Sequence, residues 1–104
     1  KDEDLRNRSE LIFRSLSNKL TPVSVISVLK KLLTSQNFFV RNFACKFLAD
    51  LAEKQIDVST IISDARKLLS DKEAGVRYNS ARILSSSGNM QNNEDKIKKI
   101  LKGE

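Results

Sequence analysis

The sequence predicts an all-α fold, because helix-breaking residues are rare and apolar residues recur at helical spacing. Only one proline and three glycines occur among the 104 residues. Apolar side chains return every three or four residues through most of the chain, as they do on the buried side of a helix. No stretch alternates apolar and polar residues in the way that a half-buried strand requires. We therefore expect about six helices.

The apolar stripes and the capping residues place these helices along the chain. We expect them at about residues 4–20, 21–33, 40–51, 58–69, 76–84 and 94–101. Thr21 suits the N-cap of the second helix. Pro22 suits its first helical position, because an N–H at that position would have no hydrogen-bond acceptor within the helix. The fifth helix is expected to fade in the Ser-Ser-Ser-Gly-Asn run that ends at Asn89. Asn93 suits the N-cap of the last helix.

Length and composition limit the class of protein. A chain of 104 residues is near the usual size of one domain, so we expect residues 1–104 to form a single one. No apolar run approaches the roughly 18 residues that a membrane span needs. The single cysteine, Cys45, cannot form an internal disulfide and predicts a cytoplasmic or nuclear location. Because the chain begins with Lys1 rather than Met, we expect a fragment or a processed product.

The net charge of +6 is spread along the chain and is compatible with an acidic protein partner or with nucleic acid. Its densest cluster is the run Lys96–Lys102, which holds four lysines. A terminal helix whose lysines face solvent explains that cluster at least as well as a strip that binds phosphates. The charge therefore leaves nucleic-acid binding as the alternative function rather than the first one.

The chain contains an internal repeat. Residues 25–48 align with residues 61–84 without a gap, at a shift of 36 positions. Lys31-Leu32-Leu33 then matches Lys67-Leu68-Leu69, and Val40-Arg41 matches Val76-Arg77. Each copy reads as one helix, a short turn and a second helix, which is the unit from which helical repeat arrays are built.

The second copy resembles the HEAT repeat family. That family has an Asp in the turn between its helices, then Val-Arg, then small residues, then a Leu seven positions after the Arg. The matching residues here are Asp71, Val76, Arg77, Ala81 and Leu84. The first copy fits through the pair Val40-Arg41 but has Ser35 where the family has Asp. Armadillo repeats are close relatives of this family and remain an alternative.

The resemblance implies a fold of antiparallel helix pairs stacked as a short right-handed α-solenoid. Residues 1–20 would form a partial first repeat, 21–56 and 57–90 two full repeats, and 91–104 a terminal capping helix. In HEAT proteins the Arg after the Val pairs with turn aspartates, which forms a ladder between repeats. By that resemblance Arg41, Asp71 and Arg77 are structural, and we expect Arg41 to reach Asp71 across the repeat boundary.

The resemblance also indicates where a partner would bind, since the second helix of each pair usually lines the concave face of a solenoid. Outside the apolar stripe, these helices carry pairs of residues that match at the repeat shift. The expected partner-binding residues are Asn42, Lys46, Asp50, Tyr78 and Arg82. Phe38 is a further candidate, either as an exposed anchor or as packing against the first helices. An ordinary solvated helix surface is the alternative for this set.

Catalytic signatures are lacking. The chain has no histidine and one cysteine, so it lacks the usual proton shuttles, metal-ligand clusters and Cys–His pairs. Cys45 aligns with Ala81 and is expected to be a small buried apolar residue. We expect no enzymatic activity, no cofactor, no metal and no small-molecule substrate. The predicted function is a protein–protein interaction module or scaffold, likened to HEAT repeats, and the alternative is a basic nucleic-acid-binding domain.

Overall fold

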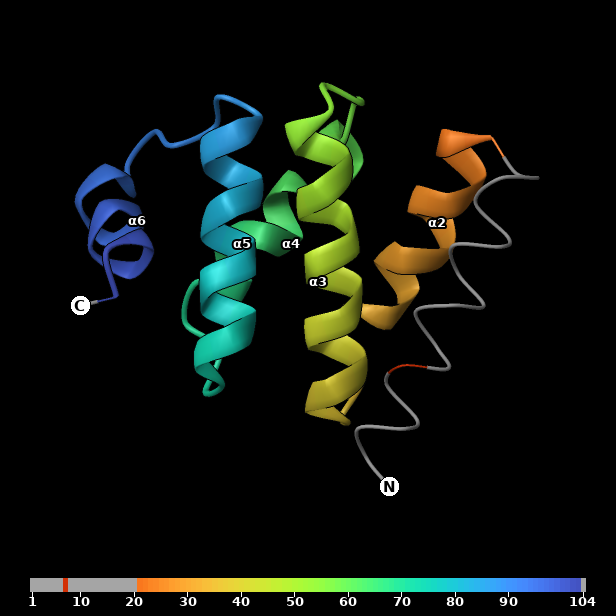
Figure 1. Ribbon diagram of the computed structural model, residues 1–104, viewed down its shortest axis with the longest axis horizontal. Helices are drawn as coiled ribbons and strands as arrows, with labels where there is room; N and C mark the ends of the chain where they lie inside the picture. The colour runs from red at the N-terminus through yellow and green to blue at the C-terminus, as the bar shows by residue number, and fades with distance from the viewer. Residues whose placement is uncertain (1–6, 8–20, 104) are drawn as a thin grey trace.

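The computed structural model describes residue 7 and residues 21–103, and this part of the chain is all-helical (Figure 1). Its α-helices are α2 (Pro22–Leu32), α3 (Phe38–Glu53), α4 (Ile62–Leu68), α5 (Ala74–Ser86) and α6 (Glu94–Leu101). The described residues contain no β-strand, which confirms the all-α class for them. The helix expected at about residues 4–20 falls almost entirely outside the described residues.

Helix α2 begins as its sequence predicts. The Thr21 hydroxyl accepts a hydrogen bond from the Ser24 N–H at 3.3 Å, and Pro22 occupies the first helical position. Lys30 and Lys31 lie in the last turn, where the partial negative charge of the helix end favours cations. The predicted cap at Thr21 is confirmed.

Helix α4 begins later than its apolar stripe suggests. A short 3₁₀ turn, Ser59–Ile61, precedes it, and the Asp57 carboxylate accepts a hydrogen bond from the Ser59 N–H at 2.9 Å. Ser, Thr and β-branched residues are weak helix formers, and the Asp57 side chain favours a turn over an α-helical start at this position. The stripe itself faces the core, because Val58 is 2% exposed and Ile61 and Ala65 are fully buried.

The helices are arranged as two adjacent pairs. Helices α3 and α5 lie side by side and run in the same direction, both upward in Figure 1. Helix α2 packs against α3, and α4 packs against α5. Helix α6 packs against the free side of α5, where Ile97 is fully buried.

Residues that align in the two sequence copies occupy equivalent places in one core. Eight aligned pairs are buried in both copies, and five of these run the length of the repeat unit. These five are Val25 and Ile61, Leu29 and Ala65, Leu33 and Leu69, Cys45 and Ala81, and Leu48 and Leu84. The internal repeat of the sequence is therefore also a repeat of core packing.

Helix α5 ends in a hydrogen-bonded capping motif, whereas helix α6 begins without a side-chain cap. Gly88 has a φ of 74°, and the Asn89 N–H donates to the Leu84 carbonyl at 2.8 Å, which closes α5 with a Schellman motif. Asn93 occupies the N-cap position of α6, but its side chain makes no capping hydrogen bond there. The predicted position of that cap is confirmed, and its side-chain bond is absent.

Candidate functional site

The turns between the paired helices repeat the same contacts at a shift of 36 residues. In the first turn the Ser35 hydroxyl accepts a hydrogen bond from the Asn37 N–H at 3.2 Å. In the second, the Asp71 carboxylate accepts one from the Glu73 N–H at 2.9 Å. Ser35 therefore performs in the first turn the local role that Asp71 has in the second, because either oxygen can accept a hydrogen bond from the N–H two residues onward.

The two arginines that follow the valines also make equivalent contacts. Arg41 Nη1 donates to the Ser35 carbonyl at 2.8 Å, and Arg77 Nη1 donates to the Asp71 carbonyl at 2.7 Å. Each guanidinium thus ties the start of the second helix of a pair to the turn before it. The sequence-based expectation that these arginines are structural is consistent with both contacts.

Arg41 additionally joins the two turns to each other. Its Nε donates to Asp71 Oδ2 at 3.0 Å, and its Nη2 donates to Asp71 Oδ1 at 3.2 Å. The two side chains are only 10% and 9% exposed, so this bidentate ion pair is screened little by solvent. Arg77 differs, because within residues 21–103 its guanidinium donates to the Asp71 carbonyl oxygen and to no carboxylate.

The ion pair sets the protonation of Asp71. Burial by itself raises the pKa of this carboxyl, whereas the hydrogen bonds from Arg41 and the Glu73 N–H and the charge of Arg41 lower it. The lowering effects prevail, and the pKa of Asp71 lies below its ordinary value. Asp71 is therefore ionised at neutral pH, and it holds two segments that are far apart in the sequence.

A second polar group, which we call the seam, fills one side of the contact between α3 and α5. It consists of Asn42, Asp50 and Glu53 on α3 and Asn79 and Arg82 on α5. Arg82 Nη2 donates to Asp50 Oδ1 at 2.9 Å and to Glu53 Oε1 at 2.8 Å. Its Nε donates to Glu53 Oε2 at 3.0 Å. One guanidinium thus bridges two carboxylates of the neighbouring repeat.

Two asparagines extend the seam. Arg82 Nη1 donates to Asn79 Oδ1 at 2.9 Å, and Asn79 Nδ2 donates to Asn42 Oδ1 at 2.8 Å. The hydrogen bond from Arg82 is the largest of the effects that lower the pKa of Glu53, and the same bond raises the pKa of Arg82. Both shifts favour the charged forms that make the contact.

The seam changes the interpretation of the predicted partner-binding set. Asn42 and Asp50 on α3 and Arg82 on α5 use their polar groups within the chain, because the sides of the two helices that carry them face each other. Lys46 is exposed, Tyr78 is 46% exposed and Phe38 is 38% exposed. These last three are the exposed residues of the predicted six, whereas Asn42, Asp50 and Arg82 are partly buried.

Sequence reasoning missed Glu53 and Asn79. Asp50 and Glu53 read as an acidic pair on a solvated helix surface, and nothing in the sequence singled out Asn79. A signal was present, because Arg41 and Asp71 are 30 residues apart, and Arg82 follows Glu53 by 29 and Asp50 by 32. Residues about 30 positions apart meet across neighbouring repeats in this fold.

The remaining candidates show no reactive chemistry. Cys45 is fully buried, and burial raises the pKa of its thiol to about 12, with a smaller contribution from the charge of Asp71. It lies in the core, as its alignment with Ala81 predicts. Among the described residues, no group of three or more His, Cys, Asp or Glu side chains is placed to hold a metal ion.

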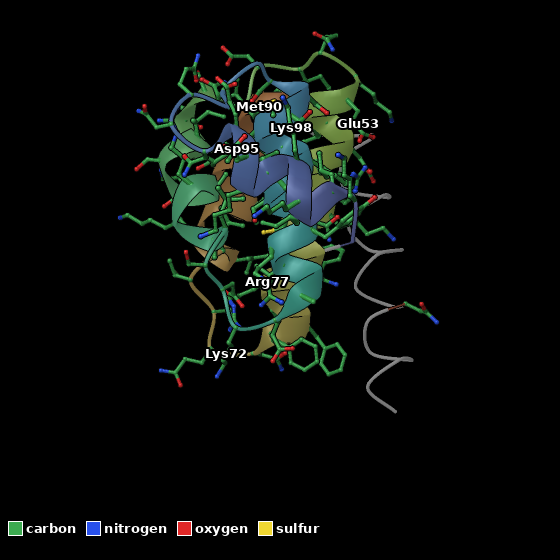
Figure 2. The ribbon with its side chains drawn as sticks, turned by 90° about the vertical axis from the view of Figure 1, so that its left-hand side faces the viewer. Glu53, Lys72, Arg77, Met90, Asp95 and Lys98 are labelled. Carbon is green, nitrogen blue, oxygen red and sulfur yellow. The ribbon has the colours of Figure 1, made fainter. Side chains whose placement is uncertain are left out.

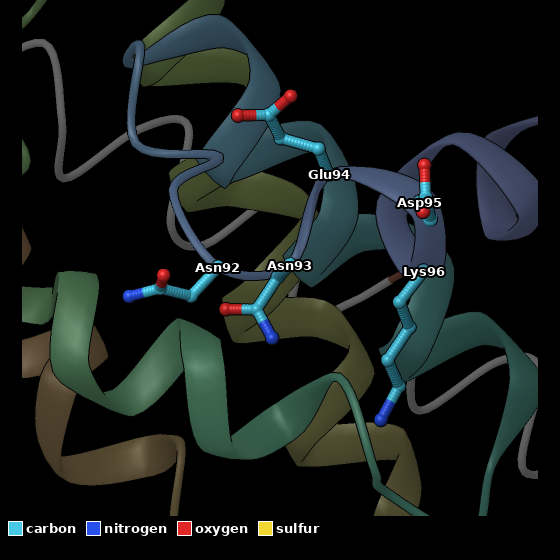
Figure 3. Close-up of a pocket in the computed structure, with 5 residues that line it drawn as sticks. All are labelled: Asn92, Asn93, Glu94, Asp95 and Lys96. Atoms are coloured by element: carbon cyan, nitrogen blue, oxygen red, sulfur yellow. The ribbon is translucent and has the colours of Figure 1, made fainter.

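An open depression lies at the start of α6, lined by residues 92–96 (Figure 3). The side chains of Glu94 and Lys96 point in opposite directions there, and Lys96 Nζ donates to Ser70 Oγ at 2.8 Å. The lining side chains do not converge on a common point, so the depression offers no arrangement for binding a small molecule. The other lysines of the terminal cluster are exposed, with Lys98 and Lys99 on α6 and Lys102 directly after it.

Comparison with family models, curated proteins and solved structures finds no match for this chain. In residues 21–103 no helix has both the length and the apolar character needed to cross a bilayer. The features available for a functional argument are therefore the repeated turns, the seam and the exposed side chains.

Proposed function

We propose that this chain is a non-catalytic protein–protein interaction module of the HEAT-like kind, with its helix pairs stacked as a short right-handed solenoid. One observation carries the proposal: the turn contacts of Arg41 and Arg77 recur at the repeat shift, and Arg41 joins one turn to the next through Asp71. Repeats that contact only their neighbours form extended surfaces, and such surfaces are generally used to bind partners. The buried thiol of Cys45 is compatible with an intracellular location.

Exposed aromatic side chains support the binding role. Phe38 begins α3 and Tyr78 lies in the second turn of α5, and since these helices are parallel, both residues belong to the same end of the molecule. The Phe38 ring lies 4.0 Å from that of Phe39, which is only partly buried. Aromatic residues contribute disproportionately to the energy of protein interfaces.

Nucleic-acid binding is the second candidate, and the exposed lysines of α6 favour it. Arg41, Arg82 and Lys30 are less available to phosphates, because each is paired with a carboxylate of the chain. A salt series of binding to fluorescent RNA and DNA separates the two functions, since affinity for phosphates falls steeply as salt rises. We expect no binding at physiological salt.

Partner capture tests the first candidate directly. The purified chain is immobilised and exposed to nuclease-treated lysate, alongside Phe38→Ala and Tyr78→Ala variants. Val23→Ala is the control, because Val23 is 77% exposed and lies on α2, whereas Phe38 and Tyr78 lie on α3 and α5. We expect both aromatic variants to lose partners that the control retains. Capture that is equal for all variants, or that disappears with nuclease, would contradict the proposal.

A further inference from the structure

The free side of α5, which we call the outer edge, is only partly covered. Figure 2 looks at this edge and shows α6 crossing its upper part, with Arg77 below α6 and Lys72 lower still. Arg77 is partly exposed, and within the described residues its only hydrogen bond is the one from Nη1 to the Asp71 carbonyl. Its Nε and Nη2 groups therefore have no acceptor there. Tyr78, the next residue, is 46% exposed.

The equivalent edge of α3 shows what such a surface binds. Arg41, which matches Arg77, gives its Nε and Nη2 to the Asp71 carboxylate of the following turn. Asn42, which matches Tyr78, lies against the start of the following helix. A Cβ built on Gly75 would be 3.0 Å from Asn42 Oδ1, so only a small residue fits beneath that side chain.

We infer that the outer edge at Arg77 and Tyr78 is a docking site for an acidic helical turn of a protein partner. The partner would present an Asp or Glu carboxylate to Arg77 Nε and Nη2, and a small residue beneath Tyr78. This inference rests on the proposed interaction role and deepens it by naming the chemistry of the partner. Because α6 covers the upper part of the edge, the site accommodates a turn and the start of a helix rather than a whole repeat.

The described part of a second copy of the chain offers no free turn that fits this site. The position that matches Asp71 is Ser35, which has no charge and already accepts a hydrogen bond from the Asn37 N–H. The position that matches Gly75 is Phe39, whose ring would meet Tyr78. The complementary turn of the described residues, with Asp71 and Gly75, is already occupied by Arg41 and Asn42, so we assign the site to a separate partner protein. Lys72 and Lys98 on the same face favour a negatively charged one.

The test uses the chain's own turn as the probe. A peptide covering residues 68–80 contains Asp71 and Gly75, and a second peptide carries Asp71→Asn. Each is titrated to millimolar concentration into the full isotope-labelled chain, and nuclear magnetic resonance follows the Arg77 Nε–Hε signal and the Tyr78 amide. We expect the Asp peptide to shift both signals and the Asn peptide to bind about tenfold more weakly, because a charge-assisted bidentate contact is lost.

Variants of the chain locate the contact. Arg77→Lys keeps the charge but not the planar fork and is expected to lose most of the response to the Asp peptide, with its fold checked by thermal melting. Lys31→Ala removes one exposed positive charge from α2, which packs against α3, and is the matched control, which should retain the response.

Three results would overturn the inference: no response at millimolar peptide, equal responses to the Asp and Asn peptides, or an Arg77→Lys variant that binds normally. A short RNA that shifts the Arg77 signal more than the Asp peptide would assign the edge to nucleic acid instead. If the peptide fails while partner capture still depends on Phe38, the outer-edge site falls and the interaction module stands. If both fail, both proposals fall.

Discussion

At the scale of single residues, Arg41 and Arg82 each form ion pairs between the two repeats, and they do so in different environments. Arg41 and Asp71 are largely shielded from solvent, whereas the Asp50 and Glu53 side chains that Arg82 contacts are each 47% exposed. A shielded pair is costly to break, because the remaining charge stays buried without a partner. Solvent screens the exposed pair and reduces its contribution.

Asp71→Asn is expected to lower the free energy of unfolding by about 2–3 kcal/mol, since Arg41 loses its counter-charge in a shielded site. Urea denaturation followed by circular dichroism measures the change. Asp95→Asn on the exposed first turn of α6 is the control, with an expected effect below about 1 kcal/mol. Equal effects of the two substitutions would show that the Arg41–Asp71 ion pair contributes no more to the free energy of unfolding than an exposed carboxylate does.

The same carboxylate predicts a pH dependence. Its pKa is lowered in the folded chain, so its contribution to stability is complete above the unfolded-state pKa and disappears as pH falls through the folded value. The unfolding free energy of the natural chain should therefore decline between about pH 5 and pH 2 more steeply than that of Asp71→Asn. Parallel pH profiles for the two proteins would contradict this assignment.

Arg82→Ala is expected to cost about 1–2 kcal/mol, because it removes contacts to Asp50, Glu53 and Asn79 that are partly screened by solvent. A double-mutant cycle with Glu53→Ala isolates the coupling between the two side chains. We expect the second substitution to cost clearly less in the Arg82→Ala background. Additive effects would mean that the seam contact is not formed in solution.

At the scale of elements, the helix ends show how similar repeats differ in detail. Helices α3 and α5 both end in Schellman motifs, with Ile56 N–H to Leu51 O at 3.0 Å in the first and Asn89 N–H to Leu84 O at 2.8 Å in the second. In each motif one residue adopts the left-handed backbone conformation. After α5 this residue is Gly88, and after α3 it is Gln55, with φ of 64°. A residue with a Cβ pays a conformational cost in that region.

Gln55→Gly is therefore expected to stabilise the chain by about 0.5–1 kcal/mol, despite the greater flexibility of glycine in the unfolded state. Thermal denaturation measures the effect. Gln36→Gly is the matched control, since Gln36 is exposed in a turn and does not have positive φ, and it should be neutral or destabilising. A lower melting temperature for Gln55→Gly would contradict the expected strain.

At the scale of the whole molecule, the two helix pairs share one core, and Cys45 reports on its integrity. Cys45 on α3 is fully buried, as is its equivalent Ala81 on α5. Burial raises the pKa of the thiol to about 12, so at physiological pH it is protonated as well as inaccessible. Thiol reagents can reach it only when the helices separate.

Labelling of Cys45 at about pH 8 should therefore be slow in native conditions. It should accelerate in Asp71→Asn by the factor by which the loss of stability raises the population of open molecules. Mass spectrometry of reagent-treated protein measures the rate. The control is the same reaction in denaturant, which should be fast for both proteins. Rapid labelling of the natural chain without denaturant would show that this part of the core opens independently of global unfolding.

The sequence by itself determined the features that depend on near neighbours. Helical periodicity, the Thr21 cap and the buried stripe from Val58 to Leu69 follow from residues within one or two helical turns, because backbone hydrogen bonds and side-chain spacing act locally. The repeat shift also placed Arg41 and Arg77 in equivalent positions, and the resemblance to HEAT repeats predicted the contact from Arg41 to Asp71.

Only the tertiary structure decided how those elements face one another. The rotation of α5 against α3 turns Arg82 toward Asp50 and Glu53 rather than toward solvent, and α6 covers one part of the outer edge while leaving Arg77 open. Neither outcome can be read from the spacing within a helix, since each depends on partners about 30 residues away and on the packing that orients them. Packing therefore decides which of these polar side chains make contacts within the chain.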